Sequence, residues 1–254
     1  RFVSGDRSST GTSAPMRKAL VKSGQAPHTA VVGCADSRCP LETLFDMMPG
    51  ELFVIRNAGN TATHSEGSMV GSLEFCCGKL GSRLIMVMGH TQCGAIVGAT
   101  GTYLANQGKA QMKPGSALEG LLTDLSGVIK KASDEMGPGA PKEKLAAHAV
   151  KVNVFETMNF LLQYSEPLRE LISSGKVDLQ GGIYHLETGR VEFLGRSPKH
   201  QELLASKSNL PPSMQKAMAR AVRTPQDKPM EPKAALQLMK EGNDRYCHGK
   251  PPRR

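Results

Sequence analysis

The sequence predicts an α/β fold in which a mostly parallel central sheet of four to five strands is flanked by helices. Short apolar runs at 30–34, 51–55 and 83–88 have the length and composition of buried strands. Segments in which apolar residues recur at helical spacing separate these runs. Strands that alternate with helices favour a parallel sheet, because each parallel connection needs a crossover.

The other elements follow in chain order and are separated by glycine- and proline-containing turns. Helices are predicted at 16–24, 41–48, 66–80, from Gly94 onward, and at 116–136, 141–163 and 165–174. Two late strands, 178–186 and 190–194, are flanked by glycine. Beyond residue 196 prolines interrupt the pattern, and one more helix is predicted at 232–246.

Composition and charge exclude several classes of protein. The chain has 254 residues, of which 39% are hydrophobic and 22% charged, a globular balance that excludes bulk disorder and collagen. Six cysteines are too few for a disulfide scaffold, and no apolar run approaches the length of a transmembrane helix.

The net charge of +9 lies mostly at one end of the chain. Residues 196–254 carry 13 Lys and Arg against 5 Asp and Glu, whereas residues 1–195 are nearly neutral. A basic segment suits an acidic protein partner, nucleic acid or anionic lipid, and a solvated linker is the alternative. The chain has no Trp, four Tyr and seven Phe, so little is available for base stacking and nucleic acid is disfavoured.

Two segments carry the residues of a predicted metal site. Cys34-Ala35-Asp36-Ser37-Arg38 begins where the strand 30–34 ends, and His90-Thr91-Gln92-Cys93 follows the strand 83–88. Ligands gather outside the carboxyl ends of strands in open α/β sheets, so these segments are expected to meet. Two cysteines and one histidine suit zinc, and three protein ligands leave the open position of a catalytic site.

Asp36 and Arg38 are expected to act as a pair beside this site. They point the same way in an extended chain, and the guanidinium favours the ionised carboxylate. Asp36 is then placed to accept a proton from a metal-bound water. It could instead ligate the metal directly, or form a structural ion pair that closes a loop.

In these motifs and the segments around them, the sequence resembles the β-class carbonic anhydrases, in their plant-like branch, over residues 20–195. The segments that carry the resemblance are Cys34 to Arg38, residues 49–60 and residues 89–95. It implies one zinc ion held by Cys34, His90 and Cys93, and a dyad of Asp36 and Arg38. The implied activity is the reversible hydration of carbon dioxide to bicarbonate and a proton through zinc-bound hydroxide.

The resemblance also implies a substrate pocket and a dimer. Gln25 matches a bicarbonate hydrogen-bond donor, Phe53, Ala58 and Phe75 match an apolar lining, and the backbone of Gly94 faces the substrate. Core packing is the alternative for each. In the family, residues from two subunits build the site, so a homodimer, a pseudo-dimer with a tandem module or a higher oligomer is expected.

The two ends of the chain resemble one another and predict a tandem array. Residues 245–249 can be laid over residues 1–5, and residues 232–246 resemble the helix that opens a family domain. We therefore predict a catalytic domain over 1–195, a basic proline-containing linker over 196–231, and over 232–254 the first helix of a following repeat. An alga is the expected source, with a plastid location favoured over the cell surface or cytoplasm.

Two other functions fit the same sequence. A carbon disulfide or carbonyl sulfide hydrolase would use the same ligands and differ in access to the pocket. A docking subunit would hold a structural zinc and use the basic segment to bind a larger assembly.

Overall fold

A computed structural model describes residues 14–62, 67–106 and 115–206 of the chain. The predicted helix at 232–246 and residues 207–231 of the predicted linker lie outside the described residues. Residues 196–206 include a short helix, α9 (His200–Ala205), which the sequence analysis did not predict. No described helix has the length and apolar character needed to cross a membrane.

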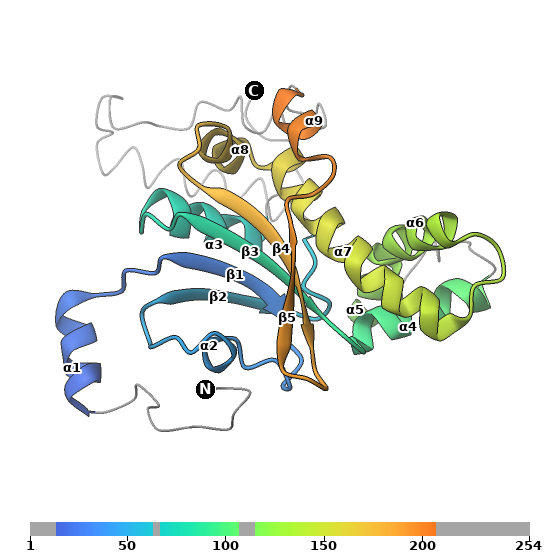
Figure 1. Ribbon diagram of the computed structural model, residues 1–254, viewed down its shortest axis with the longest axis horizontal. Helices are drawn as coiled ribbons and strands as arrows, with labels where there is room; N and C mark the ends of the chain where they lie inside the picture. Colours follow the sequence, from blue (N-terminus) through green and yellow to red (C-terminus); the bar gives the residue numbers. More distant parts are fainter. Residues whose placement is uncertain (1–13, 63–66, 107–114, 207–254) are drawn as a thin grey trace, which may run out of the picture. The chain divides into compact units, whose positions relative to one another are not determined.

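The core of the fold is a five-stranded sheet in the order β2-β1-β3-β4-β5 (Figure 1). The first four strands are parallel and β5 runs antiparallel to β4, which confirms the predicted, mostly parallel sheet. The strands are β1 (Thr29–Cys34), β2 (Leu52–Asn57), β3 (Leu84–His90), β4 (Asp178–His185) and β5 (Arg190–Gly195). Because β1 runs parallel to both of its neighbours, β2 and β3, the carboxyl ends of the three strands reach the same edge of the sheet.

The described helices confirm most of the predicted segments. They are α1 (Ala14–Ser23), α2 (Leu41–Leu44), α3 (Ser68–Gly78), α4 (Gly94–Ala105), α5 (Ala117–Asp124), α6 (Ser126–Met136), α7 (Lys142–Tyr164), α8 (Glu166–Ser173) and α9. The prediction of a single helix over 116–136 is wrong. Two helices, α5 and α6, meet at the fully buried Leu125, where the poor helix formers Ser126 and Gly127 follow.

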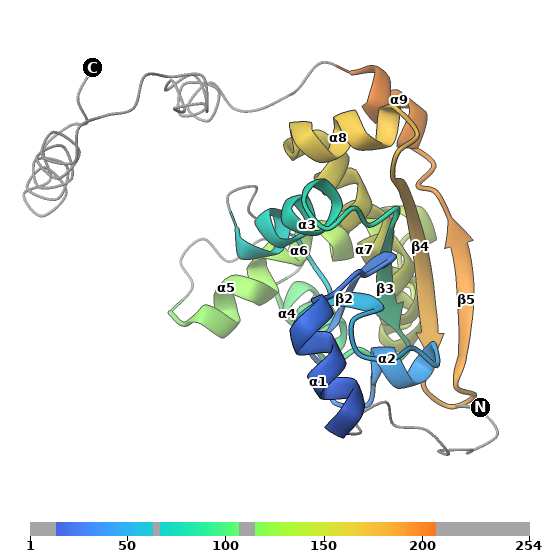
Figure 2. The same cartoon turned by 90° about the vertical axis from the view of Figure 1, so that its left-hand side faces the viewer.

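The main core lies between the sheet and the helices α3, α7 and α8, which sit together on one side of it (Figure 2). Helix α7 comes close to the strands because β3 and β4 carry glycines opposite it. A Cβ atom at Gly89 would lie 3.0 Å from Val150 and Val154, and one at Gly181 would lie 2.8 Å from Val154. A smaller core on the opposite face packs Leu41 of α2 against Val31, Met86 and Met88.

Candidate metal centre

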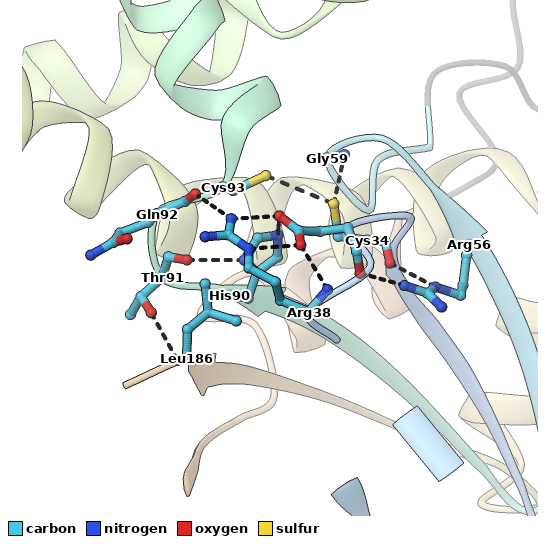
Figure 3. Close-up of polar contacts among 10 residues, drawn as sticks. Cys34, Arg38, Arg56, Gly59, His90, Thr91, Gln92, Cys93 and Leu186 are labelled. Atoms are coloured by element: carbon cyan, nitrogen blue, oxygen red, sulfur yellow. Dashed lines mark hydrogen bonds and ion pairs between the residues drawn. The ribbon is translucent and has the colours of Figure 1, made fainter. Parts of the chain in front are cut away.

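Three metal-ligand side chains meet at the carboxyl edge of the sheet (Figure 3). Cys34 is the last residue of β1, His90 is the last residue of the neighbouring β3, and Cys93 caps the first turn of α4. Their ligand atoms all lie within 4.8 Å of one another, and the two sulfur atoms are 3.9 Å apart. All three residues are at most 5% exposed, so the group is a buried Cys₂His cluster.

The short turn from His90 to Cys93 is held by the neighbouring strand. Gln92 adopts a left-handed conformation with φ of 56°, which lets the chain reverse within three residues. The Thr91 amide donates to the carbonyl of Tyr184 at 2.9 Å, and the Leu186 amide donates to the Thr91 hydroxyl at 3.1 Å. These contacts with the end of β4 fix the direction in which His90 and Cys93 project.

The imidazole of His90 is oriented as a metal ligand. Its Nδ1 lies 2.9 Å from the carbonyl oxygen of Thr91, which can only accept, so Nδ1 carries the proton. In the neutral ring, Nε2 then has a free lone pair. Nε2 is buried, and the described part of the chain offers it no hydrogen-bond partner. An orphaned buried nitrogen of this kind fits a metal ion.

The two thiols are electrostatically linked. The contact with Cys93 lowers the pKa of the Cys34 thiol, against the burial that raises it, and the Gly59 amide adds to the lowering. The same contact with Cys34, together with burial, raises the pKa of Cys93. Zinc accepts thiolate and imidazole ligands, so this donor set fits zinc and would release the shared proton on binding.

Asp36 and Arg38 form a two-pronged pair next to the cluster. The guanidinium Nε and Nη2 donate to Oδ1 and Oδ2 of Asp36 at 2.9 and 2.6 Å, and the Arg38 amide also donates to Oδ1. These bonds from Arg38 hold the pKa of Asp36 well below its usual range. Oδ2 lies 3.8 Å from Nε2 of His90, so an ionised carboxylate faces the cluster.

Arg56 is a residue that the sequence analysis did not single out. It lies on β2, and its Nε and Nη2 donate to the backbone carbonyls of Cys34 and Asp36 at 2.8 and 2.6 Å (Figure 3). The signal in the sequence is a charged residue at the end of an apolar strand. That signal does not indicate which backbone carbonyl groups the Arg56 side chain contacts.

A family model described as carbonic anhydrase matches residues 29–191. The chain belongs to the carbonic anhydrase family. It is 30% identical to carbonic anhydrase 2 of Mycobacterium tuberculosis over 192 residues, which are 75% of this chain and 84% of that protein. It is 33% identical to a carbonic anhydrase of Pseudomonas aeruginosa over 188 residues, covering 71% of this chain and 80% of the relative.

Solved structures identify the β class of carbonic anhydrase. A tetrameric β-carbonic anhydrase of Sordaria macrospora superimposes with a TM-score of 0.61 at 26% identity, covering 72% of this chain and 87% of that one. A β-carbonic anhydrase of Aspergillus fumigatus gives a TM-score of 0.63 at 25% identity, covering 75% and 85%. This chain is therefore a β-class carbonic anhydrase, and its sheet and Cys₂His cluster are features of that enzyme.

The predicted substrate residues of this carbonic anhydrase fall into two groups. Ala58 directly follows the last residue of β2, and Gly94 directly follows the ligand Cys93. Both residues are exposed beside the cluster. Phe53 lies opposite Ala30 in the sheet, and Ala30 is four residues, or about 13 Å, from Cys34 along β1. The ring of Phe75 packs at a tilt of 44° against that of Phe53, with 6.4 Å between centroids, and Gln25 precedes the amino end of β1. Within one chain, these three residues lie apart from the cluster.

Proposed function

We propose that this carbonic anhydrase catalyses the reversible hydration of carbon dioxide with one zinc ion held by Cys34, His90 and Cys93. The observation that carries the proposal is the orphaned Nε2 of His90, buried between two thiols and facing the carboxylate of Asp36. Bound zinc supplies Lewis acidity, which lowers the pKa of water and makes it nucleophilic near neutral pH.

In this proposal Asp36 orients the attacking water. Arg38 keeps the carboxylate ionised: its amide and its Nε both donate to Oδ1, and its Nη2 donates once to Oδ2. The oxygen Oδ2 retains a lone pair that can accept a hydrogen bond from the water, which turns the oxygen of that water toward carbon dioxide. The new C–O bond forms bicarbonate, and the proton of the water leaves to buffer. The engagement of both carboxylate oxygens by Arg38 favours this role over direct ligation of the metal.

We further propose that a second copy of the chain completes the substrate pocket. Gln25, Phe53 and Phe75 lie away from the cluster of their own chain, and the side chain of Phe75 is 49% exposed. In a two-fold dimer the same patch of each subunit faces the other, so the exposed Phe75 of each subunit can reach the site of its partner. A partner subunit would then supply these three residues to the cluster of the first.

Stopped-flow carbon dioxide hydration combined with zinc analysis tests the function. We expect one zinc per chain and rapid hydration by the unaltered protein. Asp36→Ala should retain zinc and lose about 10²–10⁴-fold in rate, the usual contribution of a positioned proton acceptor. Asp134→Ala, which removes an exposed carboxylate on α6, is the matched control and should hydrate at the unaltered rate.

A zinc-loaded protein that hydrates no carbon dioxide at any pH would overturn the proposal. Carbon disulfide and carbonyl sulfide, supplied in the same assay, separate the remaining possibilities. Their hydrolysis would assign the sulfur-substrate activity, and the absence of all three reactions would leave a structural zinc.

A further inference from the structure

Helix α7 places two buried polar side chains behind the loop that follows β2. The side chain of Asn153 donates from Nδ2 to the carbonyl oxygen of Gly59 at 2.7 Å, and Thr157 donates from Oγ1 to the carbonyl oxygen of Asn60 at 3.2 Å. The two side chains are four residues apart and therefore share one face of the helix. Both are at most 2% exposed.

The hydrogen bonds matter because both side chains are buried, and a buried polar group is costly unless it is hydrogen-bonded. Asn153 and Thr157 line a pocket together with Thr61, Asp124 and Glu156. The Oδ1 atom of Asn153 has no hydrogen-bond partner in the part of the chain that the structure describes. The described contact of the buried Asn153 amide is therefore its hydrogen bond to the carbonyl oxygen of Gly59.

The loop held in this way also contacts the metal centre. Gly59 and Asn60 both adopt left-handed conformations, with φ of 80° and 43°. In this conformation the Gly59 amide donates to the sulfur of Cys34 at 3.4 Å (Figure 3). A side chain at position 59 would meet Ala95 and Leu125 at 3.3–3.4 Å, so the loop also packs tightly on its other side.

We propose that Asn153 and Thr157 are positioning residues that control the donor strength of Cys34 toward the metal. By holding the carbonyls of Gly59 and Asn60, they keep the Gly59 amide aimed at the sulfur. An N–H bond withdraws electron density from a thiolate, and groups behind the ligands tune a bound metal in this way. The inference rests on the proposed function only in requiring that Cys34 bind a metal.

Cobalt substitution tests the proposal, because the thiolate-to-cobalt charge-transfer band reports the electron density on sulfur. Asn153→Leu and Thr157→Val each remove one of the two bonds that hold the loop, so the contact of the Gly59 amide with the sulfur weakens and the band should move to longer wavelength. Thr157→Ser keeps the hydroxyl and should retain the unaltered band. Thr100→Val is the matched control, since Thr100 is fully buried but its hydroxyl bonds only to Ile96 of its own helix.

A folded Asn153→Leu or Thr157→Val protein with the unaltered band would overturn the proposal, and so would an equal shift in Thr100→Val. Where Asn153→Leu does not fold, the comparison of Thr157→Val with Thr157→Ser decides. The band requires metal binding but not turnover. An unaltered protein that shows the band yet hydrates no carbon dioxide would therefore refute the proposed function alone.

Discussion

Arg56 shows how one side chain can hold the first half of the metal centre. Its guanidinium spans the carbonyls of Cys34 and Asp36, so it links a metal ligand to the carboxylate two residues later. The planar fork of arginine provides two donors in a fixed geometry, which neither lysine nor glutamine reproduces. Arg56 therefore fixes the backbone from Cys34 to Asp36, from which the sulfur and the carboxylate project.

Arg56→Gln leaves at least one of the two carbonyls without its donor, so the Cys34–Asp36 segment should move relative to His90. We expect the zinc affinity to fall by about 10–100-fold, measured by competition with a chromophoric chelator. Arg83→Gln removes an exposed arginine just before β3 and should bind zinc like the unaltered protein. Equal affinities for both variants would refute the role of Arg56.

At the scale of elements, α7 links the sheet to the metal centre. One of its faces packs on β3 and β4 through Gly89 and Gly181, and another holds the Gly59–Asn60 loop. The close approach depends on the absence of side chains at these two glycines. The position of α7 therefore depends on strand residues that carry no functional group.

Gly181→Ala tests this close packing. The new Cβ would lie 2.8 Å from Val154 and 3.0 Å from Met158, so α7 must shift, and we expect a loss of about 1–3 kcal/mol in the free energy of unfolding. Gly71→Ala on α3 is the control, because a Cβ there meets nothing within 4 Å. Alanine should stabilise that exposed helical position by about 0.5–1 kcal/mol. Urea denaturation measures both, and a neutral Gly181→Ala would contradict the packing argument.

In the molecule as a whole, the predicted site residues of one chain do not all gather in one place. The cluster and the Asp36–Arg38 pair gather at the carboxyl edge of the sheet, whereas Gln25, Phe53 and Phe75 lie elsewhere on the same chain. A two-fold dimer resolves this separation, since each subunit can complete the site of the other. The active unit is then expected to be at least a dimer.

Mixed dimers test this expectation. One subunit carries Cys93→Ser, which removes a metal ligand, and the other carries Gln25→Ala with Phe75→Ala. If the substrate residues act across the interface, a mixed dimer has one intact site and should hydrate carbon dioxide faster than either variant alone. Co-expression with two different affinity tags isolates the mixed species. If the residues act within their own chain, the mixed dimer shows no such gain.

The five strands were predicted to within two residues at each end. The first three are short apolar runs that end in turn residues, and the last two are flanked by glycines. Helix boundaries were less certain. The break at Leu125 depends on how that side chain packs into the core. Helix α9 is short, packs on α7 and lies in a proline-containing stretch of the sequence. Neither feature has a local signal strong enough to predict it.

The sheet, the family and the two segments that carry Cys34, Asp36, Arg38, His90 and Cys93 could be predicted from the sequence alone. Each of these is encoded in residues that are close together in the chain, where strand periodicity and motif spacing can be read directly. The contacts of Arg56, Asn153 and Thr157 could not be predicted in this way. Their hydrogen bonds join backbone atoms between 20 and 97 residues away, and such contacts exist only once the sheet and α7 have packed together.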